Sequence, residues 1–167
     1  MNKTIAVCPG SFDPITMGHL DIISRSSKMF DKVIVVVMSN VYKSGSSFTV
    51  EQRKKMIEKT VGELGNVEVD SYEGLLADYA ALKGAGVIVK GLRAMSDFEY
   101  EFQMALANKK LNPNLETVFL TTSAENMYLS SSMVKQIASM GGDISDFVPK
   151  AIYSDITEKF SDKNQEE

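Results

Sequence analysis

Short apolar segments alternate with amphipathic ones along almost the whole chain, and no other feature restricts its fold as strongly. Residues 33–38 form an unbroken apolar run, which is typical of a strand buried on both faces. The other predicted strands are 4–8, 67–72, 87–89 and 117–120. The predicted helices are 20–30, 50–64, 75–83, 96–111, 131–140 and 149–160. Strands joined by crossover helices predict an α/β protein with a doubly wound five-stranded parallel sheet and helices on both faces.

Turn and capping residues mark the ends of several elements. Pro9-Gly10 is expected to stop the first strand. Thr49 with Gln52, and Ser96 with Glu99, each match a capping box, in which two side chains satisfy free backbone N–H groups. These two pairs predict that helices begin near residues 50 and 96.

The length and composition suit one domain, since about 100–200 residues per domain is usual. We assign residues 1–160 to a single domain and residues 161–167 to a polar tail that is expected to fray. Eighteen Lys and Arg against 22 Asp and Glu give a net charge of −4, which disfavours nucleic acid as a partner. With one cysteine, no apolar run long enough for a membrane and no signal-peptide pattern, we expect a cytoplasmic protein.

Four of the five loops that follow the predicted strands carry groups suited to phosphate. In Rossmann-like sheets of this kind, ligands bind beyond the carboxyl ends of the strands, where strand order reverses. His19 follows the first strand, and Lys43 follows the second. Lys90 and Arg93 follow the fourth strand, and serines 130–132 follow the fifth. Because these loops meet at one edge of the sheet, we predict a phosphate-binding site there.

Each of these signals also has a structural explanation. His19 could be a capping or hydrogen-bonded core histidine, and Lys43 could be a solvated loop lysine. The two cations after the fourth strand could pair with Asp97 or Glu101, and the serines could simply cap a helix. The glycine fingerprint of dinucleotide-binding dehydrogenases and the phosphate loop of P-loop NTPases are absent, so both classes are disfavoured.

Taken in order, these loops resemble a known family. Residues 9–14 (PGSFDP), followed by Thr16-Met17-Gly18-His19, are similar to the T/HxGH signature of the nucleotidylyltransferase superfamily. Residues 90–93, then 97–101 (DFEYE), then Ser130-Ser131-Ser132 narrow the resemblance to the bacterial phosphopantetheine adenylyltransferases. The likeness covers nearly the whole chain.

This resemblance implies that the adenylyl group of ATP is transferred to 4′-phosphopantetheine, giving dephospho-CoA and pyrophosphate. It implies catalytic roles for His19, Lys43 and Arg93. The implied ATP site consists of Ser11, Phe12, His19, Gly91, Leu92, Arg93, Glu101, Asn126, Met127, Tyr128, Leu129, Ser130, Ser131 and Ser132. The implied phosphopantetheine site consists of Ser11, Lys43, Leu76, Lys90 and Asn108.

The resemblance also implies a homohexamer, assistance by magnesium, and CoA as a possible feedback inhibitor. No carboxylate cluster in the sequence resembles a metal cage, so Mg²⁺ is expected to arrive with the phosphates of ATP. Three positions depart from the family pattern. Lys90 stands where arginine is usual, Ser11 where threonine is common, and Asn126 where tryptophan often occurs.

The expected acceptor needs no general base, because a phosphate monoester with a second pKa of about 6 is mostly dianionic at pH 7. Positioning and electrostatic stabilisation would then supply the catalysis. We expect His19 to donate a hydrogen bond to the α-phosphate. Lys43 and Lys90 would hold the two anions together, and Arg93 with the serines would hold the β- and γ-phosphates.

Two alternatives stay open at this point. One is another nucleotidylyltransferase, with nicotinamide mononucleotide or glycerol 3-phosphate as acceptor. The other is a non-catalytic nucleotide or CoA sensor, which would bind ATP without releasing pyrophosphate.

Overall fold

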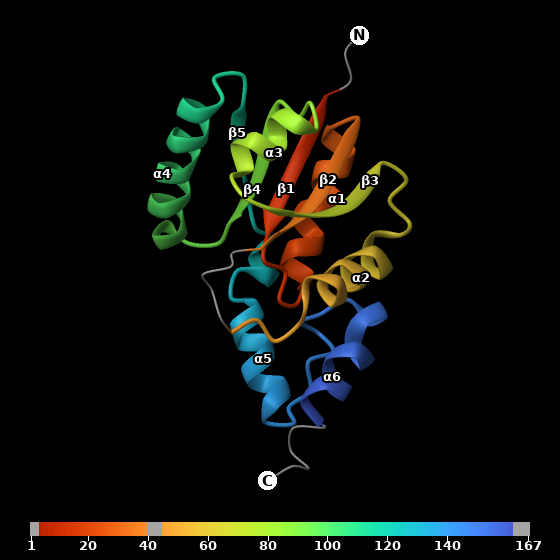
Figure 1. Cartoon of the computed structure of the whole chain (residues 1–167). Helices are drawn as coiled ribbons and strands as arrows, with labels where there is room; N and C mark the ends of the chain where they lie inside the picture. The colour runs from red at the N-terminus through yellow and green to blue at the C-terminus, as the bar shows by residue number, and fades with distance from the viewer. Residues whose placement is uncertain (1–3, 40–44, 162–167) are drawn as a thin grey trace.

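The computed structural model describes residues 4–39 and 45–161, and its centre is a five-stranded sheet whose neighbouring strands all pair in parallel (Figure 1). The strands are β1 (Ile5–Gly10), β2 (Lys32–Ser39), β3 (Val67–Glu73), β4 (Val87–Leu92) and β5 (Glu116–Thr121). They lie in the order β3-β2-β1-β4-β5, so strand order reverses between β1 and β4. The predicted doubly wound α/β sheet is confirmed.

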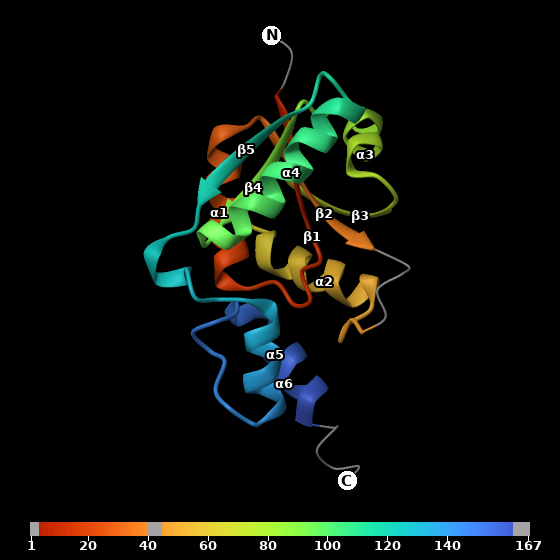
Figure 2. The same ribbon diagram turned by 90° about the vertical axis from the view of Figure 1, so that its left-hand side faces the viewer.

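Helices connect these strands and continue the chain beyond them. The α-helices are α1 (Met17–Met29), α2 (Val50–Val61), α3 (Leu76–Leu82), α4 (Met95–Leu111), α5 (Ser131–Ser139) and α6 (Tyr153–Ser161). Two 3₁₀ helices are η1 (Ala124–Asn126) and η2 (Lys150–Ile152). Figure 2 shows α5 and α6 beyond the edge of the sheet where the strands end. Within the described residues, no helix is long and apolar enough to cross a membrane. Of the predicted tail, only Ser161 is described, and it ends α6.

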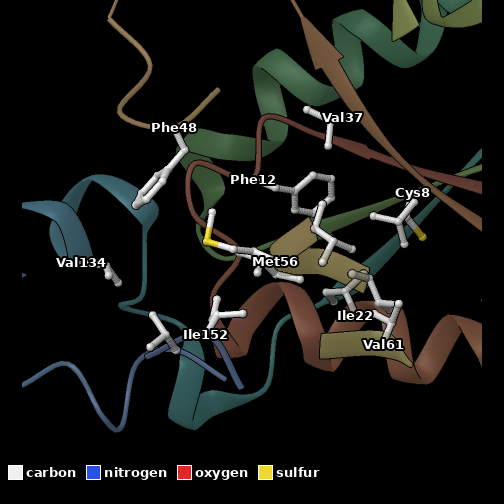
Figure 3. Packing of buried hydrophobic residues seen from close by; sticks show 14 of the residues in the cluster. Cys8, Phe12, Ile22, Val37, Phe48, Met56, Val61, Val134 and Ile152 are labelled. Carbon is white, nitrogen blue, oxygen red and sulfur yellow. The ribbon is translucent and has the colours of Figure 1, made fainter. Parts of the chain in front are cut away.

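Both faces of the sheet are covered. Successive residues of a strand point to opposite faces, so alternate residues of one strand belong to two different core clusters. Ala6, Val33 and Val35 belong to the larger core cluster, to which α1, α2, α5 and α6 also contribute (Figure 3). Val7 and Ile34 belong to a second cluster, which includes residues of α3. Helix α4 contacts α3, β4 and β5.

Strands β1 and β4 extend two and three residues past their predicted ends, and helix α1 begins three residues earlier than predicted. The prediction that β1 stops at Pro9-Gly10 is wrong, because both residues continue the pairing of β1 with β2. Strand β4 likewise runs on to Leu92, so Lys90 lies within the strand rather than after it. Helix α1 begins at Met17, because Thr16 caps it; His19 is therefore the third helical residue.

The two predicted capping boxes have different outcomes. The Thr49 pair is confirmed: the Gln52 N–H donates to Thr49 Oγ1 at 3.2 Å, and the Thr49 N–H donates to Gln52 Oε1 at 2.9 Å. The Ser96 pair is wrong, because α4 already begins at Met95 and Ser96 lies inside the helix.

Strands β1 and β4 separate toward their carboxyl ends. They are paired only at Ala6–Val87 and Val7–Ile88, whereas β1 stays paired with β2 as far as Gly10. Beyond Val7, β1 therefore forms no hydrogen-bond ladder with β4. Proline has no backbone N–H to donate, and this gap in the pairing lets Pro9 lie within the strand. The separation opens a crevice at the point where strand order reverses, which is where α/β sheets bind ligands.

Candidate active site

A cavity of about 400 Å³ occupies this crevice. Its walls come from the ends of β1 and β4, the start of α1, the first turns of α4 and the start of α5. The structure brings most of the predicted site together there. The predicted residues that line the cavity are Ser11, Phe12, His19, Lys90, Gly91, Arg93, Glu101, Leu129, Ser130, Ser131 and Ser132.

His19 is held in a capping box at the start of α1. The Thr16 N–H donates to His19 Nδ1 at 3.0 Å, and the His19 N–H donates to Thr16 Oγ1 at 3.4 Å. A ring nitrogen that accepts from a backbone N–H carries no proton, so the proton of the neutral ring is on Nε2. His19 therefore offers the cavity a hydrogen-bond donor.

The charge state of His19 follows from its surroundings. Burial, together with the nearby positive charges of Arg93 and Lys90, lowers the pKa of the imidazole from 6.5 to about 4. The ring is therefore neutral at physiological pH. Neutral imidazole is suited to donating a hydrogen bond but not to supplying a positive charge, which the two neighbouring cations provide.

Both ion pairs that were considered as structural explanations are present. Lys90 Nζ lies 3.2 Å from Glu101 Oε1, and Arg93 Nε lies 3.3 Å from Asp97 Oδ2. All four side chains also line the cavity, so ion pairing and exposure to a ligand occur together. The Nη1 atom of Arg93 donates to the carbonyl of Leu129 at 2.7 Å, which ties the residue after β4 to the segment before α5.

The three serines at the start of α5 have different roles. Ser130 is the N-cap, and its hydroxyl accepts from the Met133 N–H at 3.1 Å. The Ser131 hydroxyl donates to the Pro14 carbonyl at 2.7 Å. The Ser132 hydroxyl forms no hydrogen bond with the part of the chain that the structure describes. It is therefore the serine side chain available to a ligand in the free protein.

A second hollow of about 120 Å³ adjoins the first. It brings together Leu76, Lys90 and Asn108, three of the residues expected to bind the phosphopantetheine arm. Lys90 and Glu101 line both hollows. Lys90 thus lies between a polar cavity and a smaller hollow whose wall includes the apolar residues Ile88 and Met104.

Some predicted residues do not line either hollow. Leu92 alternates with Gly91 and Arg93 along the chain, and only those two neighbours reach the cavity. Asn126 ends η1, and its side chain donates to Ser123. Met127 and Tyr128 are exposed beside η1. Lys43 lies outside the described residues.

The cavity wall also contains residues that the sequence did not single out as site residues. Thr16 orients the imidazole, and its T-x-x-H spacing is a capping-box pattern that could have indicated this. Thr122 lines the cavity just after β5. Cys8 lines it from β1, but burial raises the pKa of this thiol to about 11, so it is not a nucleophile at neutral pH. The described residues contain no group of three or more His, Cys, Asp or Glu that could hold a metal.

Comparisons with known proteins assign the chain to a family. Residues 7–137 match the model of the cytidylyltransferase-like family. A solved bifunctional NMN adenylyltransferase/ADP-ribose pyrophosphatase from Francisella tularensis superposes with a TM-score of 0.72 at 18% identity. The superposition covers 98% of this chain and 54% of that one. The chain therefore belongs to the cytidylyltransferase-like family.

Curated relatives narrow the assignment. The phosphopantetheine adenylyltransferase of Finegoldia magna is 55% identical over 163 residues, which cover 98% of this chain and all of that protein. The enzyme of the same name from Clostridium botulinum (strain Eklund 17B / Type B) is 59% identical over 152 residues, covering 91% of this chain and 95% of the relative. Within the family, the chain belongs with the phosphopantetheine adenylyltransferases.

Proposed function

We propose that this protein transfers the adenylyl group of ATP to 4′-phosphopantetheine and releases dephospho-CoA and pyrophosphate. The observation that carries the proposal is the position of Lys90, which lines both the polar cavity and the smaller hollow. A cation shared by two adjoining sites can bring two anionic reactants together against their repulsion. The larger cavity suits a nucleotide, and the smaller one suits the arm of the acceptor.

The bond exchange occurs at the α-phosphorus of ATP. A phosphate oxygen of phosphopantetheine attacks that atom, and the bond from it to the oxygen that bridges to the β-phosphate breaks. No base is required, because the acceptor is already mostly dianionic. His19 Nε2–H donates to an oxygen of the α-phosphate, where charge shifts during in-line attack. A fixed donor of this kind acts without reorganisation at the moment of reaction.

The leaving pyrophosphate lies, in this proposal, between Arg93 and the start of α5. Arg93 already binds Leu129 through Nη1, so its guanidinium is held at the cavity wall. The free N–H groups and positive dipole end of α5 add to the Ser132 hydroxyl. We propose that Mg²⁺ enters with the phosphates of ATP as part of the substrate, a mode of binding that is common for this ion.

The test supplies purified protein with MgATP and one acceptor at a time. With 4′-phosphopantetheine, we expect dephospho-CoA by mass spectrometry and an equal amount of pyrophosphate. Release with nicotinamide mononucleotide or glycerol 3-phosphate instead would assign a different acceptor. ATP binding by calorimetry without pyrophosphate from any acceptor would identify a sensor and overturn the proposal.

We further propose that the chain assembles as a homohexamer. Apolar and aromatic side chains are exposed on several sides of α4: Tyr100, Phe102, Met104, Leu106 and Leu111. Exposed patches of this kind mark contacts between proteins. Light scattering after gel filtration should give the mass of six copies of the 18.4-kDa chain, whereas a monomer would contradict the proposal.

The same proposal includes CoA as an inhibitor and a cytoplasmic location. CoA carries the pantetheine arm and an adenine nucleotide, so it matches both hollows chemically. Inhibition that is relieved by raising phosphopantetheine would support binding in the smaller hollow. Fractionation of cells that produce the protein would test the location.

A further inference from the structure

The turn between β1 and α1 holds a phenylalanine in an uncommon backbone conformation. Phe12 has a φ of 47°, and it is the only non-glycine residue with a positive φ in the described part of the chain. A bulky side chain rarely adopts this left-handed conformation, and it persists only where the surrounding structure enforces it. The turn therefore requires strong contacts on both sides of Phe12.

The ring of Phe12 connects this turn to the imidazole. It is 4% exposed and points into the larger core cluster, as Figure 3 shows. It packs against the His19 ring in a T-shaped arrangement, with ring centroids 5.1 Å apart and an interplanar angle of 67°. A Cβ at Gly10 would lie 3.0 Å from the ring, so glycine there gives the phenyl group its space. The conformation of Phe12 thus determines where its ring contacts the imidazole of His19.

Arg53 of α2 holds the turn just before Phe12. Its Nη1 donates to the Ser11 carbonyl at 2.8 Å, and its Nε donates to the Thr49 carbonyl at 3.4 Å. The side chain is 5% exposed and forms no ion pair with the residues of the described ranges. Burial of a charged guanidinium costs folding free energy, and its hydrogen bonds offset part of that cost. Those bonds fix the peptide that enters the left-handed residue.

Asp13 holds the turn just after Phe12. Its carboxylate accepts from the Ser47 N–H at 3.0 Å, the Phe48 N–H at 2.9 Å and Lys135 Nζ at 2.8 Å. Burial alone would raise the pKa of this carboxyl, but these three hydrogen bonds lower it below its ordinary value. Asp13 therefore stays charged and joins the turn to the start of α2 and to α5.

We infer that Arg53 and Asp13 are positioning residues for His19, because they clamp Phe12 in its left-handed conformation and so fix the imidazole with its proton on Nε2. Neither residue lines the nucleotide cavity, so neither touches a reactant there. The effect passes through the Phe12 ring and the Thr16 bond to Nδ1. The inference rests on the proposed function only for its kinetic consequence; the geometric part concerns the free protein.

The test uses the fact that His19 is the only histidine of the chain, so labelled histidine gives one ring signal. The ¹³Cδ2 and ¹⁵N shifts of wild type should report the Nε2–H tautomer. Arg53→Met, which removes both donors, should give a mixture of tautomers, and Arg53→Lys should fall between the two. For both variants we expect kcat to fall, by about 10–100-fold for Arg53→Met, with KM for ATP changed less than kcat, since small misplacements act mainly on the transition state.

Lys59→Met is the matched control, because Lys59 is also on α2 and pairs with Asp155 away from the turn. It should leave both the tautomer and kcat as in wild type. If Arg53→Met does not fold by circular dichroism, Asp13→Asn and Arg53→Lys carry the same test. A folded variant with an unchanged tautomer overturns the inference, whether or not kcat falls, and so does an equal change in the control. Absence of dephospho-CoA from wild type would refute the proposed function but would leave the tautomer result decisive.

Discussion

Acidification should destabilise this protein through its single histidine. In the folded protein the pKa of His19 is about 4, whereas an unperturbed histidine has 6.5. Between these values the unfolded chain binds more protons than the folded one, so the free energy of unfolding falls as the pH falls. Each tenfold difference in proton affinity is worth about 1.4 kcal/mol, which sets an upper limit of about 3 kcal/mol. His19 as a residue is only half-buried, so we expect about 1–3 kcal/mol between pH 7 and pH 4.

Urea unfolding followed by circular dichroism at a series of pH values measures this loss. Protein concentration must be fixed, because assembly would add a concentration-dependent stabilisation. His19→Gln is the control, since glutamine can still form hydrogen bonds but does not titrate in this range. The pKa values of Asp13 and Asp70 are lowered in the folded protein from the ordinary value of 3.8. These carboxylates therefore contribute stability that is present above pH 3.8 and is lost as the pH falls further, which is below the range from pH 7 to pH 4. Parallel curves for wild type and His19→Gln from pH 7 to pH 4 would refute the reasoning.

Five substitutions test the remaining assignments. His19→Ala should lower kcat by about 10²–10³-fold, as for loss of one fixed oxyanion donor; a tenfold loss or less in steady-state assays would contradict a central role. Ser132→Ala should weaken ATP binding by calorimetry without changing the melting temperature, whereas Ser130→Ala should lower stability by about 1 kcal/mol; the reverse pattern would disprove this division. Lys90→Arg should tighten phosphopantetheine binding, and an equal dissociation constant would show that the lysine is neutral. Lys43→Ala should raise KM for the acceptor; a rise for ATP instead would reverse the two sites.

The hydrophobic pattern predicted the strands and helices, because buried strands and amphipathic helices have different periods. It failed at the end of β1, where Pro9-Gly10 was interpreted as a stop, and at the end of β4, which was predicted to end at Val89 but runs on to Leu92. Gly91 is instead a packing residue, since a Cβ there would lie 2.9 Å from Ile22 Cγ1. Such a close approach of helix and strand depends on the tertiary fold and leaves no local pattern.

The site was predicted in outline for a similar reason. The loops at one edge of a parallel sheet must meet, so His19, Lys90 and the serines could be grouped from the topology alone. The clamp around Phe12 could not, because its partners are distant in sequence: Asp13 binds residues 34, 35 and 122 positions away, and Arg53 binds Ser11 at 42 positions. Only the folded chain brings these groups together.

Arg93 and Lys90 are already paired with carboxylates, so an anion that enters the cavity must compete with Asp97 and Glu101 for them. A solitary monoanion offers each cation little more than Asp97 and Glu101 already provide. A triphosphate can replace both partners at once and leave surplus charge for the helix terminus. We therefore expect the protein to bind nucleotides but not small anions such as chloride or acetate at millimolar concentration, because the two carboxylates compete with the small anions.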